Sequence, residues 1–317
     1  MNAFKKIAAS LLHYSGINYV CSFFLRDRLF VLNYHSISDV KNCNTFSCDL
    51  YRNLSITAEQ FEKQIIFLKQ HNHSFITFRD LDTINTRNLK KPTIIYFDDG
   101  FKDVLENALP ILQRYNIPAT IFVPTGIVNR THFLWTLKYR LFLLQEGVSI
   151  SDAEKMISDL KNISDDEKDA RLKEIYEKGN FIFDHMDQNI FLSWDEIKKL
   201  SNYGWEIGSH GATHRRLTEC SDTDLAYEVF QSKTALEDKF GVAVRSFSYP
   251  YGRNDNRVND GLNKAGYGYV VSVGSGCNDL ESMDKHFNVL KSIGVRPGDK
   301  LYEFAVKIYA NNFLRKI

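Results

Sequence analysis

Two adjacent carboxylates stand directly after an apolar segment, where a charge is costly to bury. Asp98 and Asp99 follow the apolar run Thr93–Phe97 and precede Gly100. A buried carboxylate needs a counter-charge, and a cation would supply one for both residues. One Asp can then bind the cation while the other faces a water molecule, and Gly100 permits a tight turn. An ordinary Asp-Gly turn is an equally good interpretation of these three residues alone.

A pair of histidines follows a second apolar segment. His210-Gly-Ala-Thr-His214 comes directly after Trp205–Ser209. Two His side chains at this spacing can meet one metal ion if the segment makes a helical turn. With Asp99 they give a two-histidine, one-carboxylate set that leaves coordination positions open for water and substrate. A lone histidine is more often structural, so the prediction rests on the pair.

A third run combines aromatic residues with a turn. Ser246-Phe-Ser-Tyr-Pro-Tyr-Gly252 carries two tyrosines around Pro250. Tyr249 and Tyr251 could line a groove for sugars, which stack on aromatic faces and hydrogen-bond to hydroxyl groups. Taken alone, this run is more typical of an ordinary turn at the end of a strand.

The segments around these runs alternate between strand-like and helix-like patterns. Short apolar runs predict strands at 29–34, 74–77, 93–97, 119–123, 205–209, 245–248 and 267–273. Helical patterns occur at 57–70, 104–114, 193–203, 222–239, 254–265 and from Lys300 onward, and capping boxes open the first and third of these helices, at Thr57/Gln60 and Ser193/Glu196. Such alternation predicts a parallel sheet, and the number of units favours a closed or distorted (β/α) barrel. Chemistry in a barrel sits at the carboxyl ends of strands, which is where all three polar runs fall.

The chain divides into an N-terminal segment, 1–28, and a catalytic domain, 29–317, that contains a helical insertion at about 131–190. The N-terminal segment has apolar residues at helical spacing, at Phe4, Ile7, Ala8, Leu11 and Leu12. That stripe could pack on the protein's own body or lie on a membrane surface. The insertion could cap a site or form a solvated subdomain. Trp135 and Tyr139 at its start could border a substrate groove or pack between the inserted helices.

Bulk composition excludes several classes of partner. The 40 basic and 39 acidic residues leave a formal net charge of +1, so charge does not suggest nucleic acid as a partner. The 5 cysteines are scattered and include no CxxC pair, which argues against disulfides and a thiolate zinc site. No apolar stretch is long enough to span a membrane. We therefore expect a cytoplasmic protein, with contact at the inner face of the membrane through 1–28 left open. The sequence does not specify an oligomeric state.

The three runs, IIYFDDGF, GSHGATH and FSYPYG, resemble in that order the first three motifs of the polysaccharide deacetylases. That family is also called the NodB-homology domain or carbohydrate esterase family four. The opening run Leu32–Ile37 resembles the leading strand of the branch that acts on cell-envelope sugars. The resemblance covers roughly Phe30 to Arg296, without the insertion.

The resemblance implies a fold, a metal and a reaction. The fold is a distorted (β/α) barrel, and the reaction removes an acetyl or related acyl group from an amino sugar of a cell-surface polysaccharide or its precursor. The implied cofactor is a divalent metal, with Zn²⁺ first and Co²⁺, Ni²⁺ or Mn²⁺ as alternatives; it polarises the carbonyl and lowers the pKa of water. The implied roles are metal binding by Asp99, His210 and His214, general base catalysis by Asp98 and oxyanion stabilisation by the main-chain N–H of Tyr251. From the residues alone, Tyr249 and Pro250 in the same run are candidates for substrate binding. His35, which follows a strand, could reach the rim of the same site, as Trp135 could, or it could have a supporting or structural role.

Two departures from the family pattern concern the groups around the base and acid. An Arg often orients the base, but Ser248 occupies its place and Arg245 lies three positions away. The usual His after a Leu is absent from Asn288–Ile293, although His286 and Lys291 lie close in sequence, so the proton donor is unassigned. Alternative functions are hydrolysis of a small non-peptide amide or formyl group, or glycan binding without catalysis. The intact Asp98 argues against the last.

Overall fold

Seven parallel strands close into a barrel in the part of the chain that the computed structural model describes, namely residues 17–38, 52–84, 88–179, 181, 189–274 and 276–314. In ring order they are β1 (Arg28–Tyr34), β11 (Asn288–Gly294), β9 (Tyr269–Gly274), β8 (Ser246–Ser248), β7 (Glu206–Ser209), β6 (Thr120–Val123) and β5 (Pro92–Phe97). The pairing of β1 with β5 completes the ring. Two short strands extend it, because β4 (Ser74–Ile76) pairs with the start of β5 and β10 (Asn278–Asp279) runs antiparallel to β1. The predicted distorted (β/α) barrel is confirmed.

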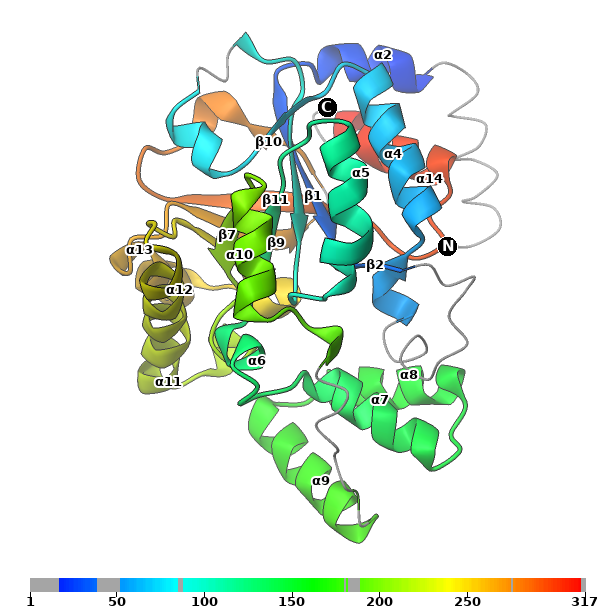
Figure 1. Ribbon diagram of the computed structural model, residues 1–317, viewed down its shortest axis with the longest axis vertical. Coiled ribbons are helices and arrows are strands. Elements are labelled where there is room, and N and C mark those ends of the chain that lie inside the picture. The colour runs from blue at the N-terminus through cyan, green and yellow to red at the C-terminus, as the bar shows by residue number, and fades with distance from the viewer. Residues whose placement is uncertain are drawn as a thin grey trace.

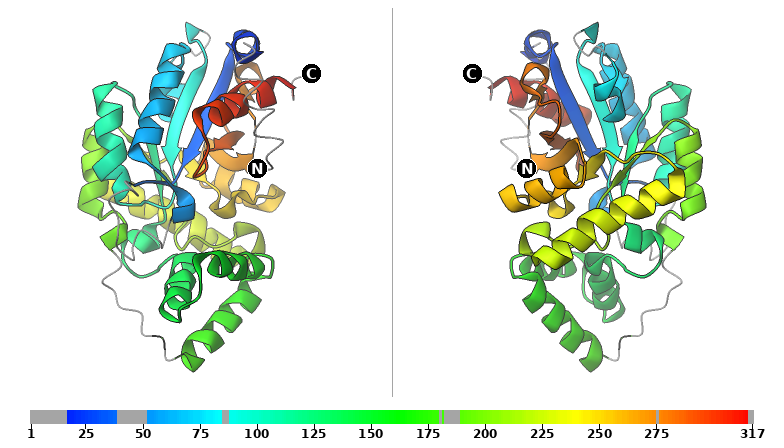
Figure 2. Two further views of the ribbon diagram at one scale, coloured as in Figure 1. Left: turned by 90° about the vertical axis from the view of Figure 1, so that its right-hand side faces the viewer. Right: turned by 90° about the vertical axis from the view of Figure 1, so that its left-hand side faces the viewer.

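Helices cover the outside of this barrel (Figures 1 and 2). Their bounds are α2 (Ile17–Phe24), α4 (Ala58–Gln70), α5 (Leu109–Arg114), α6 (Thr125–Val128), α10 (Trp194–Asn202), α11 (Asp222–Ala226), α12 (Ser232–Phe240), α13 (Asn256–Lys264), α14 (Leu301–Ile308) and α15 (Ala310–Leu314). Helix α5 continues a π-helical segment, Val104–Ala108, and a second one, Tyr227–Gln231, joins α11 to α12. The two long helices predicted for these regions are therefore interrupted. None of the helices in the described ranges combines the length and apolarity that crossing a bilayer requires.

Alternate residues of each strand face the inside and the outside of the barrel. Leu29 and Val31 of β1 pack with Ile94 and Tyr96 of β5 in an inner apolar cluster. Their neighbours along the strands belong to a larger cluster between the sheet and the helices. Because side chains in a strand alternate with a period of two, the next inner positions at the carboxyl ends are Asn33 and Asp98. Both are polar, so the interior changes from apolar packing to a polar site at this end.

Three helices occupy the range predicted for the insertion. They are α7 (Trp135–Gln145), α8 (Ile150–Leu160) and α9 (Asp165–Lys178), and they share a separate apolar cluster. Figure 1 shows them together at the end of the molecule where β1 leads into β2 (Ser36–Ile37) and β6 leads into α6. The insertion therefore lies at the carboxyl ends of the strands.

The helix caps partly follow the sequence pattern. Ser193 and Glu196 form the predicted capping box of α10. Thr57 accepts the main-chain N–H of Gln60, but the side chain of Gln60 donates to the main-chain oxygen of Asp299, 2.6 Å away. The predicted capping box of Thr57 and Gln60 is thus half formed, because a distant loop offers an acceptor for the side-chain amide of Gln60. The predicted stripe between Phe4 and Leu12 lies outside the described residues, and membrane contact through 1–28 stays a prediction.

Replacing Gly208 with Ala should destabilise the barrel. A Cβ atom there would lie 2.3 Å from Cε1 of Phe122 and 2.7 Å from Oγ of Ser246. Phe122 is fully buried, so the clash has to be relieved by moving the core, at a cost of about 1–3 kcal/mol. The measurement is the free energy of unfolding in urea.

The matched control is Gly261→Ala in α13. Its Cβ would meet nothing closer than 3.6 Å, and Ala favours a helix by up to about 1 kcal/mol over Gly. Equal stabilities for the two variants would show that the interior around Phe122 is less tightly packed than described.

Candidate active site

Three side chains with metal-binding atoms meet at the carboxyl end of the barrel. Asp99 follows β5, and His210 and His214 lie on the loop that leaves β7. Their ligand atoms all lie within 4.8 Å of one another. The Nε2 atom of His210 is 3.5 Å from Asp99 Oδ1, and the Nε2 atom of His214 is 3.3 Å from the same oxygen. Asp99 and His210 are buried and His214 is half-buried, so solvent reaches the cluster beside His214.

The protonation of His210 and the surroundings of Asp99 fit a divalent cation. Nδ1 of His210 lies 2.7 Å from the main-chain oxygen of Ser248. Because a carbonyl oxygen only accepts, Nδ1 carries the proton, which leaves Nε2 free to bind a metal. The Oδ1 atom of Asp99 is buried and accepts no hydrogen bond from the described residues. A cation between this oxygen and the two Nε2 atoms would satisfy all three.

Opposite charges act on each other within the cluster. Burial opposes ionisation of Asp99, but the rings of His210 and His214 hold the pKa of its carboxyl well below its usual range. Burial also favours neutral His210, but Asp98 and Asp99 raise the pKa of its ring. A carboxylate that is already ionised can bind a cation without first losing a proton.

The backbone is strained at three residues of this site. Asp99, His214 and Tyr251 have φ angles of 69°, 62° and 60°, in the left-handed region that residues other than Gly seldom adopt. Such conformations cost free energy and tend to occur where a side chain must be aimed in a particular direction. Each of the three predicted runs contributes one of these residues, so the strain coincides with the site.

The loop between the two histidines wraps around a buried carboxylate. It forms no helical turn, so the two imidazoles meet without the helical geometry that their spacing was taken to require. Oε2 of Glu228 instead accepts the main-chain N–H groups of Ala212 and Thr213, at 2.8 and 2.9 Å. Gly211, with φ of 79°, permits this approach, because a Cβ atom there would lie 2.7 Å from Oε2. Glu228 lies in a π-helical segment, and nothing in the sequence pattern indicated its role.

Asp98 is held by an amide rather than by a guanidinium. Nδ2 of Asn33 donates to Oδ2 of Asp98 at 2.7 Å, and both residues are buried. The other oxygen, Oδ1, accepts no hydrogen bond from the described residues and lies 3.9 Å from Nδ1 of His210. Arg245 cannot replace the family's Arg, because it lies at the start of β8 and forms an ion pair with Asp82. Asn33 therefore orients Asp98, a role that the sequence analysis did not assign.

A large cavity adjoins this pair. It has a volume of about 1220 Å³, and its lining includes Asn33, His35 and Lys161. The charge of His35 is among those that lower the pKa of Asp99, so the imidazole lies within electrostatic reach of the cluster. His35 thus lines the cavity that adjoins the Asn33–Asp98 pair, and its role at the rim stays a prediction.

The two other residues considered for proton donation lie elsewhere. His286 is exposed before the start of β11, at the opposite end of the strand from the site. Lys291 is also exposed, and it points out of the barrel because its neighbours Leu290 and Ser292 are the buried ones.

The predicted aromatic residues divide between site and core. The ring of Tyr251 packs against His214 with centroids 4.9 Å apart, and its hydroxyl accepts the indole N–H of Trp135 at 2.8 Å. Tyr249, by contrast, is fully buried and its hydroxyl donates to Asn259, so its side chain does not line a groove. Tyr139 is likewise buried within the insertion. Pro250 is buried next to Tyr251.

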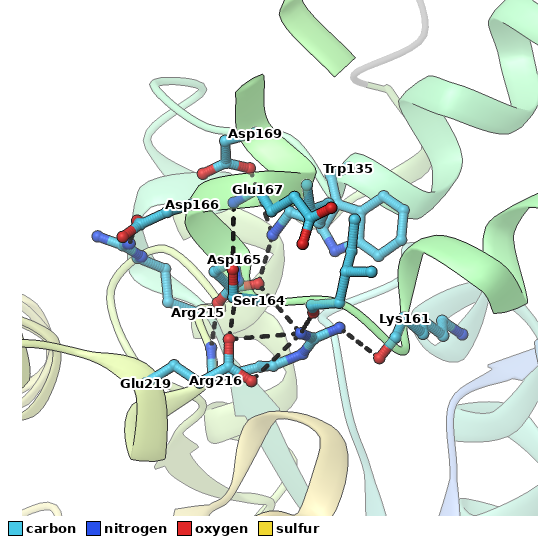
Figure 3. Close-up of polar contacts among 12 residues, drawn as sticks. Trp135, Lys161, Ser164, Asp165, Asp166, Glu167, Asp169, Arg215, Arg216 and Glu219 are labelled. Carbon is cyan, nitrogen blue, oxygen red and sulfur yellow. Dashed lines mark hydrogen bonds and ion pairs between the residues drawn. The ribbon is translucent and has the colours of Figure 1, made fainter. Parts of the chain in front are cut away.

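A buried polar network fastens the insertion to the loop that carries the histidines (Figure 3). Arg216 lies just after His214 and is 1% exposed. Its guanidinium donates to the main-chain oxygens of Ile163 and Lys161, at 2.5 and 2.8 Å. Its main-chain N–H donates to Asp165 at 3.2 Å, so α9 and the loop before it are held against the site.

The family model described as polysaccharide deacetylase matches residues 85–270, more than half of the 317-residue chain. The chain belongs to the polysaccharide deacetylase family. It is accordingly a hydrolase of non-peptide carbon–nitrogen amide bonds, as predicted. The family generally depends on a divalent metal, which agrees with the donor set described above.

Relatives and solved structures agree with this assignment. The chain is 27% identical over 250 residues to the poly-beta-1,6-N-acetyl-D-glucosamine N-deacetylase of Staphylococcus aureus, covering 76% of this chain and 71% of that one. The deacetylase of the same description from Staphylococcus epidermidis is 24% identical over 250 residues, with the same coverage. A polysaccharide deacetylase from Bacillus cereus has the same fold with a TM-score of 0.59, at 22% identity over 89% of this chain and 69% of that one. IcaB from Ammonifex degensii matches with a TM-score of 0.57, at 18% identity over 89% and 97% of the two chains.

Replacing Arg216 with Met should destabilise the protein and loosen the insertion. The change leaves two buried main-chain oxygens without their donor and removes one of the cations beside Asp165 and Glu219, and breaking a buried charged network of this kind typically costs about 3–5 kcal/mol. We expect lower stability in urea and faster proteolytic cleavage between residues 146 and 179.

The control is Arg171→Met on α9, which removes an exposed ion pair with Glu167 and should cost less than about 1 kcal/mol. If both variants unfold and cleave alike, the network does not hold the insertion in place.

Proposed function

We propose that the protein removes the acetyl group from an N-acetylated amino sugar of a cell-surface polysaccharide or its precursor. The observation that carries the proposal is the cluster of Asp99, His210 and His214 beside Asp98 at the carboxyl end of the barrel. The staphylococcal relatives, described as deacetylases of a polymer of N-acetylglucosamine, support the substrate class.

Asp99, His210 and His214 would hold the metal, and the two imidazoles and one carboxylate suit Zn²⁺ among divalent ions. When bound, the metal would act as a Lewis acid on the acyl carbonyl and lower the pKa of water. The packing of Tyr251 on His214 would fix one wall of the site.

Asp98 would act as the general base. Its Oδ2 is occupied by the amide of Asn33, which fixes the plane of the carboxylate, and its Oδ1 is left to accept the proton of the attacking water. Asn33 is neutral, so it orients Asp98 through a hydrogen bond and places no charge beside the base.

His35 would donate the proton to the leaving amine. It is half-buried in the wall of the cavity that Asn33 also lines, and it lies within electrostatic reach of Asp99. Histidine is the side chain whose ordinary pKa lies close to neutral pH, which suits a group that gives up a proton there. This assignment fills the role that the family's missing His leaves vacant.

Two neighbouring carboxylates should give opposite results in a metal analysis. Asp99→Ala removes a ligand, so elemental analysis should find the metal lost together with acetate release from an N-acetylated glycan. Asp98→Asn removes only the base, so one equivalent of metal should remain while kcat falls by about 10²–10⁴-fold. Metal loss in both variants, or in neither, would contradict these roles.

Replacing His35 with Gln should slow only the reactions that need a proton donor. We expect kcat for an N-acetyl sugar to fall about 10²–10⁴-fold with metal content unchanged. An activated acetyl ester, whose leaving group departs without a proton, should be cleaved at nearly the wild-type rate.

The matched controls are His286→Gln and Lys291→Gln, both directed away from the site. If His35→Gln lowers kcat equally for the N-acetyl sugar and for the activated ester, the imidazole is not the proton donor.

A further inference from the structure

The charged side chains that line the cavity beside Asn33 and Asp98 are all positive among the described residues. Its lining includes Lys161, Arg296 and Lys307 together with His35. No Asp or Glu belongs to the lining among the described residues. For a chain whose 40 basic and 39 acidic residues nearly balance, this is a local excess of positive charge. A concave wall with charges of one sign focuses its field on the cavity and attracts ions of the other sign.

Two of these cations are available to a ligand. Lys307 is occupied, because its ammonium pairs with Asp299 and contacts the main-chain oxygen of Gly294 at 3.3 Å. Lys161 and Arg296 form no ion pair with any residue in the described ranges. By contrast, the neighbouring Arg216 is fully engaged in its buried network. The cavity therefore presents one ammonium and one guanidinium that form no ion pair within the described residues.

The two cations approach the cavity from different parts of the fold. Lys161 directly follows α8 in the insertion, whereas Arg296 lies on the loop after β11 of the barrel. A ligand that contacts both must lie between the insertion and the barrel, next to Asn33.

Lys161 is also close to the reacting groups. It lines the same cavity as Asn33 and His35, and its main-chain oxygen accepts a hydrogen bond from Arg216, two residues after His214. An anionic group held by Lys161 would consequently lie in the same cavity as Asn33, which holds the base, and His35.

We propose that the protein selects a saccharide in which a sugar unit next to the N-acetylated one carries an anionic group, either a carboxylate or a phosphate. This inference rests on the proposed function and narrows its substrate class. Arg296 can hold a carboxylate or phosphate through two parallel hydrogen bonds, and Lys161 adds a point charge from the facing wall. A polymer of N-acetylglucosamine alone has no such group, so the substrate differs in charge from the one named for the staphylococcal relatives.

The test compares three saccharides of equal length on the metal-loaded protein. One is an oligomer of N-acetylglucosamine, one alternates N-acetylglucosamine with glucuronate, and one carries phosphodiesters between N-acetylglucosamine units. We expect kcat/KM for acetate release to be at least about tenfold higher for one of the two anionic saccharides at low salt, and this preference to shrink as ionic strength screens the charges. A preference for the glucuronate saccharide would identify the group as a carboxylate, and a preference for the phosphodiester saccharide would identify it as a phosphate.

Substitutions test whether the two cations cause the preference. In Lys161→Gln and in Arg296→Gln the ratio of anionic to neutral kcat/KM should fall about tenfold, mainly through KM. Lys198→Gln removes another exposed charge, on α10 and outside the cavity, and should leave the ratio unchanged. A ratio near one in the wild type, or one that neither cavity substitution lowers, overturns the inference.

Binding to Asp98→Asn separates this inference from the proposed function. Calorimetric titration of that variant with the same three saccharides measures selection without catalysis. Preferential binding of an anionic saccharide, with no acetate released by the wild type, would overturn the deacetylation and retain the charge selection. Acetate release without any preference in rate or affinity would overturn the charge selection and retain the deacetylation.

Discussion

Two adjacent carboxylates buried at the end of β5 are the constraint on which the rest of the site depends. Neither Asp98 nor Asp99 can stay ionised in such a place unless the protein supplies compensating groups. The fold supplies different ones to each: two imidazoles face Asp99, and one amide holds Asp98. The left-handed backbone at Asp99 turns the second side chain away from the first, so that two like charges serve separate purposes.

The closed barrel makes this arrangement possible because it brings β1 next to β5. Their pairing aligns Asn33 with Tyr96, one step before Asp98 along the same inner row. An open sheet with β1 and β5 apart would leave Asp98 without its amide. The apolar inner cluster below these residues keeps water from the lower part of the barrel and sets the depth of the polar site.

The sequence was most informative where the evidence is local. Apolar runs of strand length, each followed by polar residues, were sufficient to predict seven strand positions and the meeting of Asp99, His210 and His214. Contacts between distant segments could not be predicted in this way. Asn33 lies 65 residues before Asp98, and Glu228 supports the histidine loop from within a helix whose π-helical turn has no sequence signature. Tyr249 shows a related difficulty, since a tyrosine at a strand end has the same pattern whether it faces a groove or the core.

The anchoring of the insertion through Arg216 affects how the chain can diverge. A helical segment inserted into a barrel is usually regarded as an exchangeable module. Here the guanidinium that holds it belongs to the loop of His214, and its acceptors are the main-chain oxygens of Lys161 and Ile163. Changes in the insertion and in the loop are therefore expected to occur together. A chimera carrying the insertion of a relative would have to take the residues after His214 from the same relative.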